Sequence, residues 1–392
     1  RSDIDRALMS EIYPWREGNH FELLIDGPEF FARMLQAIDA AVSRVDLELY
    51  LVSSGHCANA LIEHLSAAAQ RGVQVCCLCD GFGAQGLLST DRQRLLQAGV
   101  GLRWYNPVSW RSGVRNLYRD HRKLLLVDGC LAYVGGAGVT DDFWDPATNT
   151  CAWHEVMVEQ RGPLVQDWQM LFDLQWLACA APKAWTTLSA PSQQQLPAIP
   201  RSGDGWGRVA YASAREHRDI LQSLLRSIMA GRQRVWLATP YFLPTWKVRR
   251  ALRKAASRGV DVRLLLTGQH TDNQPVRYAG QGYYPALLRA GVRIFEYQPR
   301  FTHLKMVLVD DWVSVGSCNF DYWNLRFNLD ANLEAVDTPL SQAVAASFSA
   351  DFACCTETTL QQWRALPLAE RLQQRLWGWL NSLVVRFFKK RL

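Results

Sequence analysis

Two short segments of the sequence carry the same reactive residue types at the same spacing. On a β-strand, residues two positions apart point to one face, so the histidine and lysine of each segment are expected side by side. Two lysines can bind the oxygens of a phosphodiester, while one histidine attacks phosphorus and another protonates the leaving oxygen. The pattern favours covalent phosphoryl-group transfer that needs no metal. The residues are His121, Lys123 and Asp128, and His303, Lys305 and Asp310.

The aspartate of each segment is expected in a turn. Asp128-Gly129 predicts a two-residue hairpin turn after an apolar strand, which would pair Val127 with Cys130. Asp310-Asp311 predicts the same turn in the second segment. Both aspartates lie off the face that carries histidine and lysine, so we expect them to stabilise the turns rather than to carry protons.

The elements that position these segments form an internal repeat. In each copy an alanine-rich helix ends at glycine and an apolar strand follows, which is the alternation of an α/β sheet. The chain is therefore expected to consist of two copies of one α/β domain. Three blocks recur in the same order: 65–81 as 252–268, 95–107 as 287–299, and 121–128 as 303–310.

These repeats predict the domain boundaries. The first repeat is expected over 1–185, a Ser/Gln/Pro-rich linker over 186–204, the second repeat over 205–355, and an amphipathic basic helix over 356–392. In that last segment apolar residues recur at helical spacing among arginines and lysines, which is typical of a helix on an anionic membrane surface. A terminal helix packed on the domain is the alternative.

Composition narrows the class of protein. The chain has 392 residues, 48% of them hydrophobic and 20% charged, which excludes disordered and collagen-like proteins. A net charge of +6 is a weak signal for nucleic acid, so no nucleic-acid partner is expected. The ten cysteines lie scattered or in apolar runs, and neither a signal peptide nor an 18-residue apolar run is visible. We expect reduced cysteines, no metal and a cytoplasmic protein.

The paired segments, with Gly316-Ser317-x-Asn319 after the second, resemble the signatures of the phospholipase D superfamily. The resemblance implies two similar α/β sandwich domains, related as a pseudo-twofold repeat, with one active site at their interface. It is closest in kind to bacterial cardiolipin synthases of the type without N-terminal transmembrane helices. The segments behind this narrower resemblance are Trp15–Asn19, Asp80–Gly83, Tyr241–Pro244 and Ala251–Ala255.

The resemblance also implies roles for the site residues. His121 would become the phosphohistidine and His303 would be the general acid, with Ser317 and Asn319 binding phosphate. One residue departs from the pattern, because Gly138 stands where an asparagine is expected. This removes an amide donor to phosphate, which Thr140 or a backbone N–H would have to replace.

A carboxylate downstream of each segment is implied to orient the histidine of that segment. By position these carboxylates are Glu155 in the first repeat and Asp330 in the second. A carboxylate on one ring nitrogen selects the tautomer and supports positive charge on the ring. An ordinary exposed acid at each position is the alternative.

The implied activity is a phosphatidyltransferase without a cofactor. It would move a phosphatidyl group from one phospholipid, phosphatidylglycerol or phosphatidylethanolamine, to a hydroxyl of phosphatidylglycerol. A phospholipase D or nuclease that uses water, and a non-catalytic membrane-binding relative, are the alternatives. The expected partner is an anionic bilayer, contacted through the C-terminal helix and the 110–119 loop. The expected location is the inner face of the cell membrane.

Overall fold

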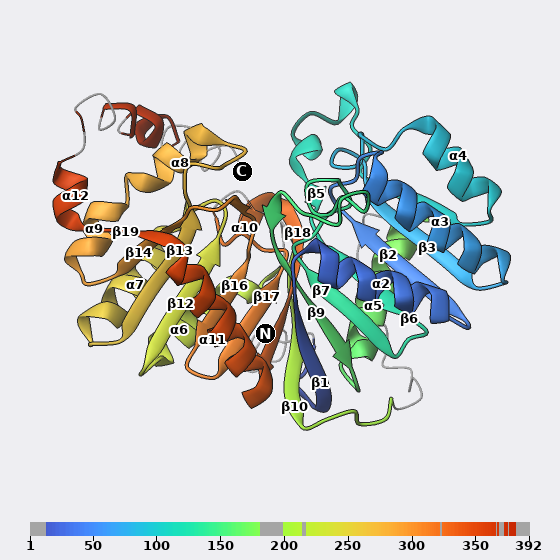
Figure 1. Ribbon diagram of the computed structural model, residues 1–392, viewed down its shortest axis with the longest axis horizontal. Coiled ribbons are helices and arrows are strands. Elements are labelled where there is room, and N and C mark those ends of the chain that lie inside the picture. Colours follow the sequence, from blue (N-terminus) through green and yellow to red (C-terminus); the bar gives the residue numbers. More distant parts are fainter. Residues whose placement is uncertain are drawn as a thin grey trace, which may run out of the picture.

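The fold consists of two halves of the same architecture, each a sheet with helices on both faces (Figure 1). A computed structural model describes residues 13–180, 199–213, 217–321, 324–365, 367, 372–374 and 376–381. Most of the expected linker lies outside these residues, and so does the expected C-terminal helix after residue 381. The described chain is the α/β protein with an internal repeat that the sequence predicts.

The sheet of the first repeat has the strand order β4-β3-β2-β6-β7-β9-β1. Strands β2, β3 and β4 are parallel, and the remaining neighbours are antiparallel. The strands are β1 (Arg16–Ile25), β2 (Arg44–Leu49), β3 (Gln74–Asp80), β4 (Gly101–Tyr105), β5 (Arg119–Asp120), β6 (Leu124–Val127), β7 (Leu131–Gly135), β8 (Trp153–His154) and β9 (Val156–Arg161). The helices are α2 (Gly27–Ala40), α3 (His56–Gln70), α4 (Ser89–Gln97), the 3-10 helix η1 (Trp110–Leu117) and α5 (Val165–Ala180).

The second repeat has the equivalent order β14-β13-β12-β16-β17-β18-β10, with β19 added at the edge beside β14. Its strands are β10 (Gly205–Ser213), β11 (His217–Arg218), β12 (Arg234–Thr239), β13 (Asp261–Thr267), β14 (Arg293–Tyr297), β15 (Phe301–Thr302), β16 (Met306–Val309), β17 (Trp312–Gly316), β18 (Asn328–Val336) and β19 (Cys355–Thr358). Its helices are α6 (Asp219–Ala230), α7 (Trp246–Ser257), α8 (Gln274–Gln281), α9 (Tyr284–Arg289), α10 (Asn324–Phe327), α11 (Thr338–Ala353) and α12 (Leu360–Arg364).

The repeated blocks of sequence build equivalent elements. Helix α3 leads into β3 through Gly72, and α7 leads into β13 through Gly259. Both glycines have positive φ, +92° and +87°, where an L side chain would be strained. The Arg-Gly-Val sequence common to both blocks therefore marks the same helix stop in each repeat.

The two repeats share a central hydrophobic core. Each outer helical layer has its own cluster of buried residues, and a third cluster lies between the sheets. This central cluster combines residues of both sheets with α5 and α11, for example Trp168 and Phe348. The edge strands β1 and β10 also pair with each other, at Arg16 with Gly207 and Asn19 with Gly205. The repeats thus form one folded unit around their interface.

One predicted hairpin register is wrong and the other is confirmed. In the first repeat Val127 pairs with Leu131, not with Cys130. Asp128 and Gly129 have positive φ and Cys130 donates its N–H to the Val127 carbonyl, so Cys130 is an extra residue before pairing resumes. In the second repeat Val309 pairs with Trp312, as the two-residue turn predicts.

The predicted end of the second repeat at residue 355 is too early. Cys355–Thr358 forms β19, which pairs antiparallel with β14, and the short helix α12 follows. The four-residue Cys-Thr-Glu-Thr segment completes the hydrogen bonds of an edge strand, a tertiary effect that helical periodicity further along the chain does not signal.

Candidate active site

Each motif begins beside a strand of the other repeat. Strand β5 runs parallel to the start of β18, and β15 runs parallel to β8. The N–H of His121 consequently donates to the Leu329 carbonyl at 2.9 Å, and the N–H of His303 donates to the His154 carbonyl at 2.8 Å. In Figure 1, β5 and β18 are labelled close to the boundary between the halves. Both histidines therefore lie at the interface of the repeats.

The orienting carboxylates are exchanged between the repeats. His121 Nδ1 lies 3.0 Å from Asp330 Oδ1, and His303 Nδ1 lies 2.7 Å from Glu155 Oε2. The prediction that each carboxylate orients the histidine of its own repeat is wrong. The inter-repeat pairing explains this, because Asp330 follows Leu329 and Glu155 follows His154, which are the residues that accept the histidine N–H groups.

The environment of both histidines favours neutral rings. Burial lowers the pKa of His121 to about 4, the charge of Lys123 adds to this effect, and Asp330 opposes it. Burial and the charges of Lys305 and Lys123 likewise hold the pKa of His303 well below its usual value. When the neutral His121 ring donates its Nδ1–H to Asp330, its lone pair is on Nε2, which is the nitrogen that can attack.

The two lysines are buried beside the histidines. Lys123 is 3% exposed and donates to the His121 carbonyl, whereas Lys305 is fully buried and lies 3.2 Å from Glu155 Oε2 and 2.8 Å from His303 Nδ1. Burial lowers the pKa of Lys123 to about 7, and Lys305 contributes to this shift. Burial also lowers the pKa of Lys305. Two buried cations that influence each other are a suitable environment for an anionic phosphodiester.

The motif aspartates lie in the turns. The Asp128 carboxylate accepts hydrogen bonds from the N–H groups of 42, 43 and 44, and the Asp310 carboxylate from those of 232, 233 and 234. Burial acts to raise the pKa of each carboxyl, but these backbone donors outweigh it, so both pKa values are lowered. This geometry agrees with the turn-stabilising role expected from the sequence.

Ser317 supports a carboxylate. Its hydroxyl donates to Asp330 Oδ1 at 2.7 Å and accepts from the Ala331 N–H at 3.1 Å. This hydroxyl proton is therefore engaged in the structure, and the serine lies behind Asp330. Asn319 is 3% exposed, and within the described part of the chain its Oδ1 has no hydrogen-bond partner.

Gly138 stands where the backbone leaves no room for a side chain. A Cβ at this position would lie 2.7 Å from the Leu51 carbonyl oxygen and 3.1 Å from the Phe143 ring. Close packing against Leu51 and Phe143 thus explains why glycine, and not asparagine, stands at this position. Thr140, two residues further along the chain, is buried, and among the described residues its hydroxyl has no hydrogen-bond partner.

Aromatic side chains that the sequence reasoning did not single out surround the histidines. The His303 ring lies 5.3 Å from Trp153, 5.4 Å from Phe143 and 5.8 Å from Phe301, measured between ring centroids. The His121 ring has an edge-on contact with Tyr50 at 4.8 Å. Trp153 and Phe301 each lie within two residues of a site residue, which is the one signal in the sequence that could have identified them.

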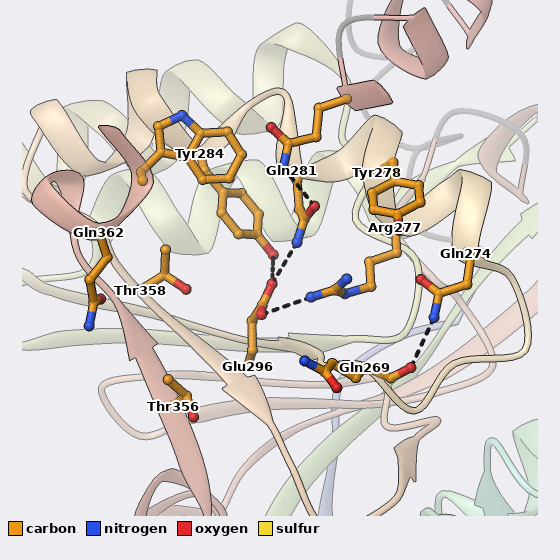
Figure 2. A pocket seen from close by; sticks show the side chains of 12 residues that line it. Gln269, Gln274, Arg277, Tyr278, Gln281, Tyr284, Glu296, Thr356, Thr358 and Gln362 are labelled. Carbon is orange, nitrogen blue, oxygen red and sulfur yellow. Dashed lines mark hydrogen bonds and ion pairs between the residues drawn. The ribbon is translucent and has the colours of Figure 1, made fainter. Parts of the chain in front are cut away.

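The described residues contain no group of three or more potential ligands that could hold a metal ion. A separate cavity of about 550 Å³ lies in the second repeat, between α8, α9, β14, β19 and α12. Figure 2 shows Arg277, Gln281 and Tyr284 directed at Glu296, and each donates to this carboxylate at 3.0 to 3.1 Å. Because both oxygens of Glu296 already accept hydrogen bonds, this carboxylate joins α8 and α9 to β14 and is not part of the histidine site.

Comparison with known proteins identifies the family of the chain. The family described as "Cardiolipin synthase, PLD-like domain" matches residues 34–176 and 224–352. The chain is 33% identical over 368 residues to cardiolipin synthase A of Pseudomonas aeruginosa, covering 93% of this chain and 73% of the relative. It is also 33% identical over 336 residues to cardiolipin synthase B of Escherichia coli, covering 84% and 79%.

The fold has a structural counterpart as well. A crystal structure of phosphatidylserine synthase from Haemophilus influenzae matches 99% of both chains with a TM-score of 0.71 and 12% identity. In the described ranges, none of the helices combines the length and the apolar character that crossing a bilayer requires. The chain belongs to the cardiolipin synthase family of the phospholipase D superfamily, and it is an enzyme of the phosphatidyltransferase type.

Proposed function

We propose that this enzyme transfers a phosphatidyl group from one phospholipid to a hydroxyl of phosphatidylglycerol through a phosphohistidine on His121. The observation that carries the proposal is the exchanged pair of contacts, His121 with Asp330 and His303 with Glu155. With these contacts each repeat supplies half of one site, and neither half is complete alone.

In the first step His121 Nε2 attacks the phosphorus of the donor lipid. A nitrogen–phosphorus bond forms, the bond from phosphorus to the headgroup oxygen breaks, and His303 gives its proton to that oxygen. The ammonium groups of Lys123 and Lys305 bind the phosphoryl oxygens and stabilise the charge that grows on them. Asn319 is a further candidate ligand of these oxygens.

In the second step a hydroxyl of phosphatidylglycerol attacks the same phosphorus. Its proton passes to His303, the bond from phosphorus to His121 Nε2 breaks, and the diphosphatidyl product leaves with both histidines restored. Water in place of the lipid hydroxyl would release phosphatidic acid.

The position of Lys305 supports His303 as the acid. Nδ1 of His303 faces both the Glu155 carboxylate and the Lys305 ammonium, so it can donate to one or accept from the other. When Nδ1 accepts from the Lys305 ammonium, the hydrogen of the neutral ring is on Nε2. The ring stays neutral on donating this hydrogen because Lys305 passes a proton to Nδ1. A bound phosphodiester anion also offsets the charge of the lysines, which raises the pKa of His303 toward protonation.

We further propose that the enzyme binds the inner membrane surface through the η1 segment of the first repeat. Trp110 is 85% exposed and Val114 is 49% exposed, and the arginines Arg111 and Arg115 of the same segment are exposed. Apolar side chains flanked by cations are typical of segments that lie in an anionic interface. In the C-terminal stretch Leu372 and Trp379 are exposed, and the basic residues expected after Asn381 lie outside the described residues.

Vesicles of phosphatidylglycerol test the proposal. We expect the purified protein to release cardiolipin and glycerol in equal amounts, and His121→Ala to release neither. Vesicles that also contain phosphatidylethanolamine would release ethanolamine if that lipid is the donor. Phosphatidic acid as the main product would contradict transfer, and full activity of His121→Ala would contradict the covalent intermediate.

A further inference from the structure

A third histidine lies directly beside the active site without belonging to it. His154 is 3% exposed and precedes Glu155. Its Nδ1 lies 2.8 Å from Asp26 Oδ1, and its Nε2 lies 3.1 Å from both carboxylate oxygens of Asp351. Asp26 precedes α2 in the first repeat and Asp351 belongs to α11 in the second. The imidazole therefore bridges the two repeats.

The two aspartate contacts of His154 together require a charged ring. Carboxylate oxygens only accept hydrogen bonds, so both ring nitrogens must carry hydrogen to bond both aspartates. Burial acts to lower the pKa of His154, but Asp26 and Asp351 outweigh it and raise this pKa to about 9. The Tyr297 ring stacks on the imidazole at 5.2 Å. Arg300 Nη2 lies 3.3 Å from His154 Nδ1. The other titratable groups around the cluster in the described part of the chain are Cys151, Cys354, Cys355 and Glu155.

Asp26 has a strained backbone conformation. Its φ of 67° and ψ of 158° lie in a region that residues other than glycine rarely adopt. Although it occupies the N-cap position of α2, its side chain makes no capping hydrogen bond. The carboxylate bonds His154, Arg300 and the N–H of Glu155 instead.

The cluster is connected to the reacting groups through the backbone. The N–H of Asp26 donates to the Glu155 carbonyl at 2.9 Å, and the N–H of His303 donates to the His154 carbonyl at 2.8 Å. Residues 154 and 155 are thereby held from both repeats. The Glu155 carboxylate then meets His303 Nδ1.

The second repeat supports its carboxylate differently. There Asp330 receives a hydrogen bond from Ser317, and the residue before it is Leu329. In the first repeat the position of Ser317 is taken by Gly136, where a Cβ would lie 2.1 Å from Glu155 Oε2. Glu155 therefore has no serine to hold it, and a charged histidine stands where the other repeat has leucine.

We propose that charged His154 is a positioning residue, which holds Glu155 on His303 and so prepares the acid–base half of the site. This rests on the proposed role of His303. The positive charge is the essential feature, because it satisfies Asp26 and Asp351 together and keeps the neighbouring backbone in place. Neutral His154 could bond only one of the two aspartates as a donor.

Two substitutions at this position test the proposal. His154→Leu copies the second repeat, and His154→Arg keeps a cation with several donors that does not lose its proton. We expect His154→Leu to lower kcat about 10- to 100-fold with little change in KM, the size typical of residues that orient a reacting group. His154→Arg should recover most of kcat. His64→Leu is the matched control. His64 also bonds an aspartate, with its Nδ1 2.6 Å from Asp39 Oδ1, but this pair lies away from the site.

The pH dependence gives a second readout. Besides any decline that Lys123 causes at lower pH, wild-type kcat should fall further above about pH 9 as His154 loses its proton, and His154→Arg should lack this second limb. The proposal would be overturned if His154→Leu had the same kcat as the wild type. It would also be overturned if the Leu and Arg variants lost kcat equally while their melting temperatures matched that of the wild type.

Nuclear magnetic resonance of ¹⁵N-histidine keeps the test independent of catalysis and of variant folding. In the wild type the ring nitrogens of one histidine, assigned to His154 from its through-space contact with the Tyr297 ring, should both remain protonated at pH 8. A His154 ring that is neutral at pH 7.5 would overturn the proposal even if every variant misfolds. The NMR measurement does not depend on any reaction product, and the kcat ratios can be measured whether the product is cardiolipin or phosphatidic acid. A failure of the proposed transfer reaction can therefore be distinguished from a failure of the role proposed for His154.

Discussion

At the scale of single residues, the two histidines differ through what touches their ring nitrogens. His121 Nδ1 meets Asp330, which Ser317 also bonds, whereas His303 Nδ1 meets both Glu155 and Lys305. The first arrangement selects one tautomer and leaves a lone pair on Nε2. The second allows the proton to move between ring nitrogens. This difference favours a nucleophilic His121 and a proton-transferring His303, although the motifs are alike in sequence.

The pH dependence of kcat/KM follows from the same contacts. A base with a pKa of about 4, as for His121, keeps its lone pair as the pH falls, so activity should persist from pH 7 to about pH 5 and decline below. Lys123, with a pKa of about 7, loses its charge as the pH rises, so phosphate binding and kcat/KM should decline on the alkaline side.

Lys123→Arg separates these limbs, because arginine stays charged throughout the range. Steady-state kinetics should show the alkaline decline of kcat/KM displaced to higher pH in this variant and the acid limb unchanged. An acid limb centred above pH 6, or an alkaline limb that does not move, would refute the assignment.

At the scale of elements, the motif turns hold strand ends together. Asp128 bonds three successive N–H groups at the start of β2, and Asp310 does the same at the start of β12. In both hairpins the turn is thus anchored by a carboxylate outside the site, although their registers differ. The four-residue strand that follows each lysine is buried in the sheet.

Asp128→Ala should therefore affect stability more than chemistry. Loss of these hydrogen bonds should lower the free energy of unfolding by about 1 to 3 kcal/mol. Chemical denaturation measures this value, and kcat should stay within about threefold of the wild type. Asp204→Ala is the control, because that side chain is fully exposed. A large loss of kcat with unchanged stability would give Asp128 a chemical role instead.

The element η1 is expected to carry membrane affinity. Trp110→Asp combined with Val114→Asp places charge on exposed apolar positions and should weaken binding to anionic vesicles about tenfold or more. Met229→Asp is the matched control, since Met229 is 64% exposed at the end of α6 in the other repeat. Vesicle sedimentation measures both variants. Equal binding by both would exclude η1 as a contact.

At the scale of the whole molecule, the site exists only because the repeats are docked. Internal similarity of the sequence predicts the two α/β units, their helix stops and the second hairpin register, because these depend on local chemistry. It does not predict which carboxylate meets which histidine, since that depends on the pairing of β5 with β18 and of β15 with β8. The contacts of the Phe143 and Trp153 rings with the His303 ring also arise from this packing between the repeats.

Some departures have local causes that a sequence pattern cannot express. The extra residue Cys130 follows from the backbone angles of the turn, and the absence of an asparagine at Gly138 follows from the close approach of Leu51. The strand β19 forms because β14 offers it an edge. His154 has no counterpart in the second repeat, so comparison of the repeats alone does not show its use.

The central claim is that His121 and His303 act on one phosphorus atom from opposite sides. The most direct test traps the intermediate with a phosphatidyl p-nitrophenol ester, whose leaving group needs no protonation. In His303→Ala the first step should proceed and the second should stall, so peptide mass spectrometry after rapid acid-free quenching should find the phosphatidyl group on His121. A phosphatidyl group on any other residue, or continued turnover by His121→Ala, would contradict the account.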